Sequence, residues 1–163
     1  MVPFGFELWR FGRATEALWI AAERASVRDG GKMPLPVDER WARETEEMLG
    51  RRFPESYRAR MMRDNGGEIE AVADTWSLYP ICDKSDRKRI KRTCNHVLLE
   101  TRSALSWAGF PRDAVAIASN GSGDLLVFLP DERDPDAFEP CVRLWNHETR
   151  EIESVAEFDE LSA

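Results

Sequence analysis

Apolar positions recur at helical spacing in two neighbouring segments of the chain. Between Asp38 and Gly50, and again within 53–67, apolar side chains return every three or four residues, which predicts two amphipathic helices. Asp38 is a favourable N-cap, Pro54 suits a first helical turn, and Gly50 suits the residue that ends a helix. The side chains predicted to face inward are Trp41, Thr45, Met48 and Leu49 in the first helix and Phe53, Tyr57, Met61 and Met62 in the second.

A longer helix is predicted from about Asp83 to Trp107. One continuous apolar face runs along it, made of Ile90, Cys94, Val97, Leu98, Thr101 and Leu105. Residues 84–92 hold six basic residues and one acidic residue, and they occupy the first turns of this helix, where cations are unfavourable. The basic cluster is therefore either a solvated helix face or a binding surface.

Short apolar runs bounded by turn-forming residues predict strands in the rest of the chain. The expected strands cover 76–81, 114–118, 125–129 and 141–145, and a short strand with a terminal helix follows within 152–161. Because helices come first and antiparallel strands later, the order of elements predicts the α+β class.

The segment "ASNGSGDLLVFL" at 118–129 contains the most conspicuous polar cluster. It lacks the lysine of a P-loop, the third glycine of a dinucleotide fingerprint and the alternating ligands of an EF-hand. Asn120, Gly121 and Gly123 tolerate positive φ angles and lie between two β-rich runs. The segment therefore predicts a hairpin loop.

The chain length of 163 residues suits a single main domain with a substantial core. Glycines and prolines at 28–36 predict a boundary, so residues 1–34 are interpreted as an N-terminal extension packed on the body and 35–163 as the main domain. Four aromatic residues support this packing, although an exposed docking patch is the alternative. They are Phe4, Phe6, Trp9 and Phe11.

The expected compartment is the cytoplasm. No apolar run approaches the ~20 residues that span a bilayer, and charged residues precede the apolar run at 17–22, unlike in a signal peptide. Cys82, Cys94 and Cys141 match no disulfide framework and no zinc motif, so free buried or half-buried thiols are expected.

Charge is distributed unevenly along the chain. The net charge is −7, which argues against direct binding to nucleic acid or to an anionic membrane. Residues 131–163 hold eleven acidic and three basic residues, a balance of −8, whereas 84–92 carry +5. An acidic surface with one basic cluster indicates contact with a charged macromolecule.

Residues with catalytic or metal-binding potential form no recognisable motif. His96 and His147 are the only histidines, and the stretch "HETRE" lacks the second histidine of a zinc-protease motif. No metal and no cofactor is therefore expected. Carboxylates have no diagnostic spacing, which leaves open a hydrolase built on carboxylates that the fold brings together.

Four segments in order resemble the Smi/Knr-like branch of the SUKH superfamily. They are "EEMLGRRFPESYRARMMRDNGG", "WSLYPICD", "AIASNGSGDLLVF" and "VRLWNHETREIESVAEFDEL". The resemblance covers about 38–163 and leaves the first 34 or so residues outside it. It implies an α+β fold with a central, mostly antiparallel sheet flanked by helices, and a non-enzymatic role. Bacterial members are typically immunity proteins that neutralise toxins, often nucleases of polymorphic toxin systems.

The leading hypothesis is a cytoplasmic immunity protein that binds a cognate toxin domain through complementary surfaces, with a neighbouring gene as the expected source of the toxin. The candidate contact residues lie at predicted strand ends and turns, and they are Trp76, Tyr79, Asp83, Asp124, Trp145, His147 and Glu148. The alternative is an intracellular adaptor that binds a peptide or small-molecule ligand in the same region. The sequence does not indicate the oligomeric state.

Overall fold

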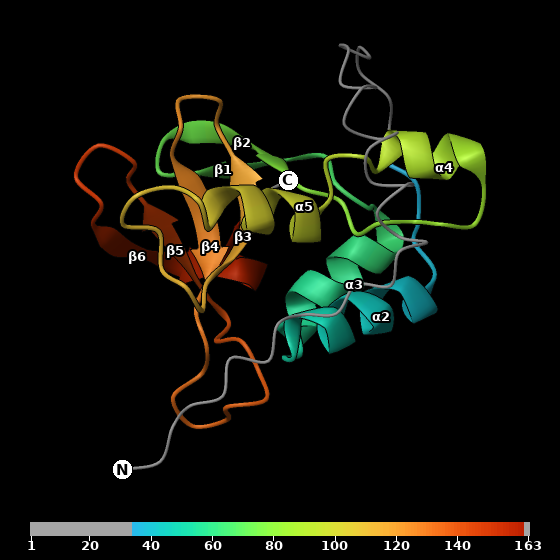
Figure 1. Cartoon of the computed structure of the whole chain (residues 1–163), viewed down its shortest axis with the longest axis horizontal. Helices are drawn as coiled ribbons and strands as arrows, with labels where there is room; N and C mark the ends of the chain where they lie inside the picture. Colours follow the sequence, from blue (N-terminus) through green and yellow to red (C-terminus); the bar gives the residue numbers. More distant parts are fainter. Residues whose placement is uncertain (1–33, 162–163) are drawn as a thin grey trace.

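The computed structural model describes residues 34–161, and these form an α+β fold around one six-stranded sheet (Figure 1). The helices are α2 (Glu39–Leu49), α3 (Glu55–Arg63), α4 (Arg87–Arg92) and α5 (Val97–Ala104), with a 3₁₀ turn, η1 (Phe158–Glu160), near the end. The strands are β1 (Glu68–Ala71), β2 (Asp74–Leu78), β3 (Val115–Ser119), β4 (Leu125–Phe128), β5 (Cys141–Trp145) and β6 (Ile152–Glu157). The expected fold class is confirmed.

The sheet is an antiparallel meander in which each strand pairs with the next one along the chain. Its central strands are covered on both faces. On one face Trp145 of β5 packs against Phe110 beyond α5, and on the other Phe128 of β4 packs edge-on against Tyr57 of α3. Leu125 is paired with Trp145, so Phe128, three residues farther along the same strand, faces the opposite side.

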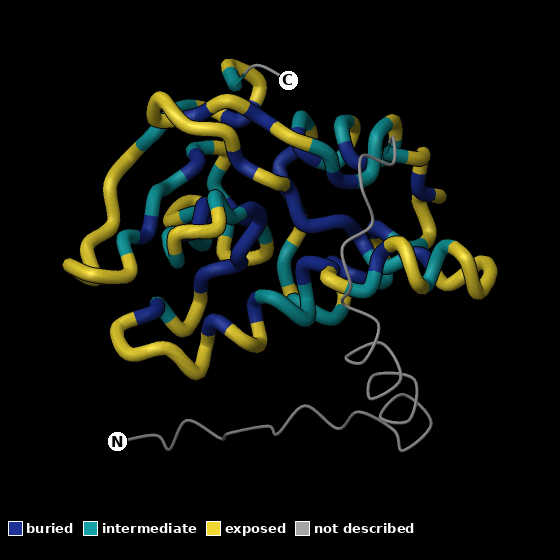
Figure 2. Tube along the Cα trace, turned by 90° about the horizontal axis from the view of Figure 1, so that it is seen from above, coloured by how far each residue is buried: buried dark blue, intermediate teal, exposed yellow. Residues whose placement is uncertain are grey.

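Burial along the strands follows from this arrangement (Figure 2). All four residues of β4 are buried, as in a strand covered on both faces. In β1 buried and exposed residues alternate, because only one face of that strand is covered. Each large apolar side chain that becomes fully buried contributes about 1.5–3 kcal/mol of hydrophobic free energy.

The two predicted early helices are confirmed, with the expected caps on the first. The Asp38 side chain accepts a hydrogen bond from the Arg40 N–H, and Gly50 adopts a left-handed conformation with φ of 70°. In α3, Pro54 lies at the N-cap position, one residue before the first helical turn. Tyr57 and Met61 lie in the core, which confirms the inward stripe.

The predicted single helix from Asp83 to Trp107 is wrong, because the chain turns between α4 and α5. The Thr93 hydroxyl donates a hydrogen bond to the Arg89 carbonyl and accepts one from the Asp83 N–H. These bonds fix the end of α4 against the segment that precedes the helix. The Val97 N–H donates to the Pro80 carbonyl, which starts α5 in a new direction. Tertiary hydrogen bonds thus override the continuous apolar pattern.

Two strands and the end of the chain also differ from the prediction. Strand β1 was not predicted, and β2 covers Asp74–Leu78 and so ends before Pro80, where the prediction placed the end at 81. After β6 the chain forms the short 3₁₀ turn η1 in place of a terminal helix. Prediction and structure agree for β5 and agree within one residue for β3 and β4.

Several expectations concern residues 1–33, and these lie outside the described residues. They include the packing of the N-terminal extension and of its aromatic residues. Within 34–161 every helix is too short or too polar to cross a membrane. Cys82, Cys94 and Cys141 are free and half-buried, as expected.

Candidate functional site

Three hairpin turns lie side by side at one end of the strands of the sheet (Figure 1). They connect β1 to β2, β3 to β4 and β5 to β6, and in an antiparallel meander alternate connections emerge on the same side. We call the turn residues 72–74, 120–124 and 146–151 together the hairpin rim. Two side-chain contacts join the neighbouring turns into one surface.

The middle turn of the hairpin rim is the predicted glycine-rich loop, and it is confirmed as a hairpin connection. Gly121 and Gly123 have φ angles of 81° and 110°. The Asn120 side-chain oxygen accepts hydrogen bonds from both the N–H and the hydroxyl of Ser122. This local bonding is typical of Asx turns and fixes the loop without any ligand.

The middle turn is bonded to the last turn through Asp124 and His147. One carboxylate oxygen of Asp124 lies 3.0 Å from the His147 backbone nitrogen and 2.8 Å from its ring Nδ1. Partial burial alone would raise the pKa of Asp124, but the hydrogen bonds from His147 outweigh it and lower this pKa. A Cβ atom added to Gly123 would lie 3.0 Å from the imidazole, so the ring packs directly on that glycine.

The first turn is bonded to the middle turn through Asp74 and Asn120. The Asn120 amide nitrogen donates to the Asp74 carboxylate at 2.9 Å. Val72 and Ala73, at the tip of this turn, have φ angles of 53° and 55°, a left-handed region that β-branched residues rarely adopt. Val72 is 53% exposed, so a strained apolar side chain projects at this end of the hairpin rim.

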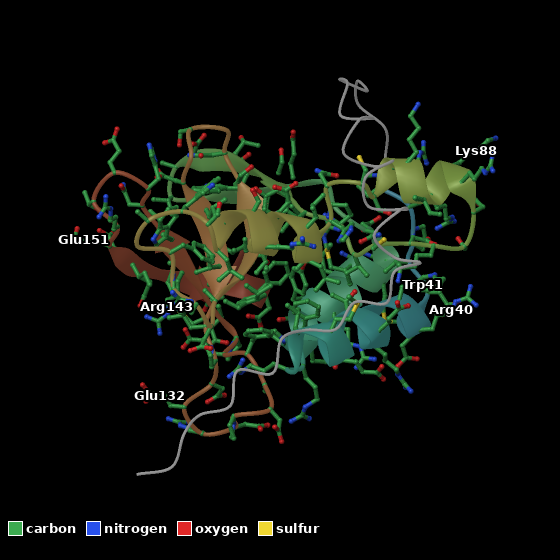
Figure 3. All side chains as sticks on the ribbon, in the orientation of Figure 1. Arg40, Trp41, Lys88, Glu132, Arg143 and Glu151 are labelled. Carbon is green, nitrogen blue, oxygen red and sulfur yellow. The ribbon has the colours of Figure 1, made fainter. Side chains whose placement is uncertain are left out.

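The last turn is ordered by its own first residue. The Asn146 side-chain oxygen accepts from the N–H groups of Glu148 and Thr149 at 2.9 and 3.0 Å. Arg150 has a φ of 63°, and the Arg150 N–H closes the turn on the Asn146 carbonyl. Glu148 and Glu151 are exposed, and Figure 3 shows Glu151 on the outer side of β6.

An aromatic cluster supports the last turn from beneath. Trp145, the last residue of β5, is 1% exposed, and its indole N–H donates to the Gly109 carbonyl at 3.3 Å. The Trp107 ring packs against Trp145 in a tilted arrangement, with a centroid distance of 5.8 Å, and Trp107 is itself 40% exposed. Among residues 34–161, Trp107 is therefore the tryptophan near the hairpin rim whose ring is available to solvent.

The seven predicted contact residues do not form one site. Asp124, His147 and Glu148 meet at the hairpin rim, and Trp145 lies directly below it. Trp76 lies inside β2 with 2% exposure and donates its indole N–H to the Ala71 carbonyl. Tryptophan at these two strand positions fills the core and leaves little side-chain surface for a partner.

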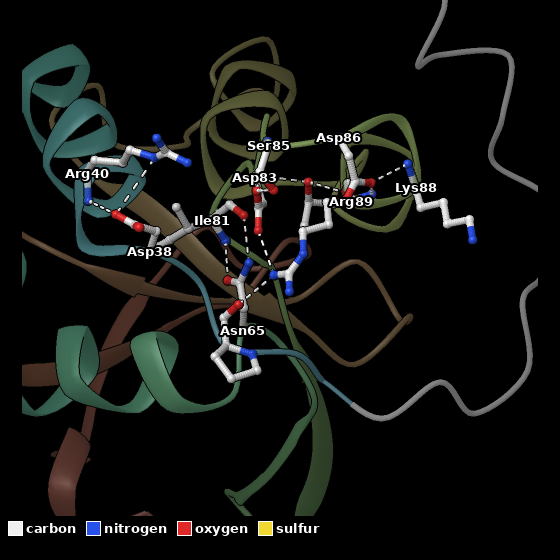
Figure 4. A network of polar contacts seen from close by, with 11 residues as sticks. Asp38, Arg40, Asn65, Ile81, Asp83, Ser85, Asp86, Lys88 and Arg89 are labelled. Carbon is white, nitrogen blue, oxygen red and sulfur yellow. Dashed lines mark hydrogen bonds and ion pairs between the residues drawn. The ribbon is translucent and has the colours of Figure 1, made fainter.

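Tyr79 and Asp83 follow β2 as the chain runs away from the hairpin rim, and Tyr79 still lies beside β3, since its N–H donates to the Ile117 carbonyl. Tyr79 is buried, and this burial raises its pKa. Asp83 is 3% exposed and accepts hydrogen bonds from Ser85 and from the Arg89 guanidinium (Figure 4). Asp83 thus anchors α4 to the body, away from the rim turns.

Sequence reasoning missed four residues of this region, namely Val72, Asp74, Asn120 as a link between turns, and Trp107. The β1–β2 turn had a signal in the alternation of apolar and polar residues on both sides of Val72-Ala73, but that dipeptide is not a usual hairpin turn. Trp107 had no signal, because the predicted long helix included it.

Around the hairpin rim the described residues offer a surface for binding. Within 34–161 no group of three or more His, Cys, Asp or Glu side chains is arranged to hold a metal ion. The Ser122 hydroxyl lies next to the Asp124 carboxylate and donates a hydrogen bond to the Asn120 side-chain oxygen at 2.7 Å, so it is held within the loop. What the hairpin rim offers is a rigid row of turns with carboxylate, imidazole and apolar groups.

Comparison with known proteins identifies the family. The chain gives no significant match among curated proteins or among solved structures. The model of the SMI1 / KNR4 family (SUKH-1) matches residues 36–161, which include all the described helices and strands. The matched region contains all four segments that carry the resemblance, so the chain belongs to the SMI1 / KNR4 family, SUKH-1.

Proposed function

We propose that this protein is a non-enzymatic immunity protein that binds and neutralises a cognate bacterial toxin domain in the cytoplasm. Membership of a family associated with immunity proteins supports the proposal. The observation that carries it further is the hairpin rim, because three turns joined by Asp74–Asn120 and Asp124–His147 contacts form a preorganised surface. Preorganisation lowers the entropy lost when a partner binds.

The charge of the molecule is consistent with a basic partner such as a nuclease. Residues 131–163, which include the last turn of the hairpin rim, carry a balance of −8. Opposite fields speed up association and disfavour partners with the wrong charge. An acidic inhibitor surface would therefore cover the basic face through which a nuclease holds nucleic acid.

We propose that Asp124, His147 and Glu148 contact the toxin, with Val72 and Trp107 as apolar anchors at the two sides of the surface. The two anchors are 53% and 40% exposed, and tryptophan is one of the residues that most often dominate the binding energy of an interface. Trp145, Trp76, Tyr79 and Asp83 then act from within, by holding the strands and α4 in place.

The test uses the full chain and the toxin domain encoded beside its gene. Calorimetric titration should show a tight complex, and co-expression should protect cells from the toxin. Glu148→Lys should weaken binding by about tenfold or more, since a charge reversal at the interface is repulsive. Glu47→Lys changes net charge equally but lies on the exposed side of α2, so it should bind normally.

Three results would oppose the proposal. They are no binding to any neighbouring toxin, binding without protection, and equal effects of the two charge reversals. A thermal shift with a metabolite or a peptide, combined with no toxin binding, would favour an adaptor instead.

A further inference from the structure

The short helix α4 carries four cations that have no partner within residues 34–161. Arg87, Lys88, Lys91 and Arg92 form no side-chain hydrogen bond or ion pair with another described residue. The other two cations of this segment are engaged, since Lys84 pairs with Glu44 and Arg89 with Asp83. A compact group of free positive charges thus projects from one six-residue helix.

This charge arrangement opposes the stability of the helix that bears it. Arg87 and Lys91, and likewise Lys88 and Arg92, are four residues apart and therefore lie on the same face, where like charges repel. Arg87 and Lys88 also stand in the first turn, which prefers acidic residues, whereas Lys91 and Arg92 lie in the last turn, where cations are favourable. A purely structural helix at this place would gain from neutral or mixed side chains.

Tertiary contacts nevertheless hold α4 firmly in place (Figure 4). The Asp86 carboxylate caps the helix by accepting from the N–H groups of Lys88 and Arg89 at 2.7 and 2.9 Å. The Arg89 guanidinium donates to the Asp83 carboxylate at 2.8 Å and to the Pro36 carbonyl at 2.7 Å. In the same view Lys88 extends away from this network, so a rigid base presents it outward.

The basic helix is also distant from the acidic part of the molecule. Figure 3 shows Lys88 at one end of the view and Glu151 at the opposite end. Residues 84–92 carry +5, whereas the other 154 residues carry −12. The two surfaces can therefore bind partners of opposite charge without competing.

We propose that α4 is a docking surface for an acidic polypeptide segment of a partner protein, with Arg87, Lys88, Lys91 and Arg92 as its charge contacts. Leu35 adds an apolar contact beside the helix, since it is 38% exposed and precedes Pro36, whose carbonyl binds Arg89. This proposal does not depend on toxin binding at the hairpin rim.

The size of the cluster favours a polypeptide over a nucleic acid. A six-residue helix is only about 9 Å long. A duplex extends far beyond that length and would bring its phosphates near the acidic remainder of the protein. A short acidic segment can match the helix and avoid those repulsive surfaces.

The experiment measures fluorescence anisotropy of a labelled peptide rich in Glu and Asp with interspersed Leu, at physiological ionic strength, with the full chain. The variant Lys88→Gln, Lys91→Gln, Arg92→Gln should bind at least about tenfold more weakly. The control Arg63→Gln, Arg112→Gln, Arg133→Gln removes equal charge from exposed positions elsewhere and should keep nearly full binding.

If the four cations had only a structural role, the α4 variant would lose stability. The proposal instead predicts that this variant loses the peptide but melts at the same or a higher temperature, because repulsion within α4 falls. Failure of the native chain to bind the peptide would overturn the proposal, and so would equal loss in both variants. Binding to a DNA duplex or to phosphatidylserine vesicles in preference to the peptide would overturn it too.

Discussion

At the residue scale, two glycines of the β3–β4 loop differ in what surrounds them. Gly123, with φ of 110°, has the His147 ring against it, whereas Gly121, with φ of 81°, has open space around the position of a Cβ atom. Both conformations are unfavourable for other residues, but only Gly123 also supports the Asp124–His147 contact.

Gly123→Ala is therefore expected to destabilise the fold by about 2–3 kcal/mol, from backbone strain together with displacement of the imidazole. Gly121→Ala should destabilise it by about 1 kcal/mol, because only the backbone term applies. Urea unfolding of both variants measures the difference. Equal losses would show that the packing of His147 on Gly123 contributes nothing.

His96 is expected to make the stability of the fold depend on pH. Burial, assisted by the nearby Lys84 charge, lowers the pKa of His96 from 6.5 to about 4. The folded protein thus keeps this imidazole neutral, while the unfolded chain takes up a proton below pH about 6.5. Stability should fall as the pH drops from there and should stop falling, for this group, below about 4.

The expected loss between pH about 7 and about 5 is on the order of 1–2 kcal/mol. His96→Gln should flatten the dependence in this window, which lies above the usual titration range of carboxylates. Thermal unfolding at several pH values measures the slope. A slope as steep in the variant as in the native chain would assign the pH dependence to other groups.

At the element scale, the first hairpin is built on an unusual turn. Strands β1 and β2 are joined by Val72 and Ala73, which both have positive φ, as a type I′ turn requires. Asn-Gly is the favoured dipeptide at these positions, and a β-branched residue there is strained. An exposed apolar residue kept in a strained turn is consistent with a role in binding.

Replacing Val72-Ala73 with Asn-Gly should therefore raise the free energy of unfolding by about 1–2 kcal/mol. It should also weaken the proposed toxin complex, because the exposed Val72 side chain is lost. Calorimetric unfolding and toxin titration measure the two effects. An unchanged melting temperature would contradict the strain, and stronger toxin binding would contradict the role of Val72 as an anchor.

Local signals predicted those elements whose limits are set by neighbouring residues. Asp38 and Gly50 delimit α2 through bonds made within the helix and its caps. The break between α4 and α5 depends on two hydrogen bonds, one between Thr93 and Asp83 and one between Val97 and Pro80. The first joins residues that are 10 apart in the sequence, and the second joins α5 to the segment that follows β2. Such contacts leave no trace in apolar periodicity.

The same distinction explains the candidate site. Asp124 and His147 were both predicted from turn patterns, but their contact depends on the pairing of β4 with β5. Trp76 and Trp145 were expected at strand ends, but their burial depends on tertiary packing that local patterns do not show, such as that of Phe110 on Trp145. Exposed Trp107 follows the helix whose length was predicted wrongly.

At the scale of the whole molecule, charge separation links the two proposals. The basic helix α4 and the acidic region around β5 and β6 lie far apart, so the protein has a large charge asymmetry. In an electric field from a basic partner, such a molecule is oriented before contact, with the hairpin rim leading. Orientation of this kind affects the association rate more than the lifetime of the complex.

Association with the neighbouring toxin should consequently slow by about tenfold or more as ionic strength rises from low to physiological values, because the Debye length shrinks from ~30 Å to ~8 Å. The dissociation rate should change little, since it depends on the short-range contacts of Val72, Trp107 and the turns. Stopped-flow measurement of tryptophan fluorescence separates the two rates.

The variant Lys88→Gln, Lys91→Gln, Arg92→Gln makes the chain more acidic and should associate as fast or faster with a basic toxin. Slower association of that variant would place α4 inside the toxin interface and join the two surfaces into one.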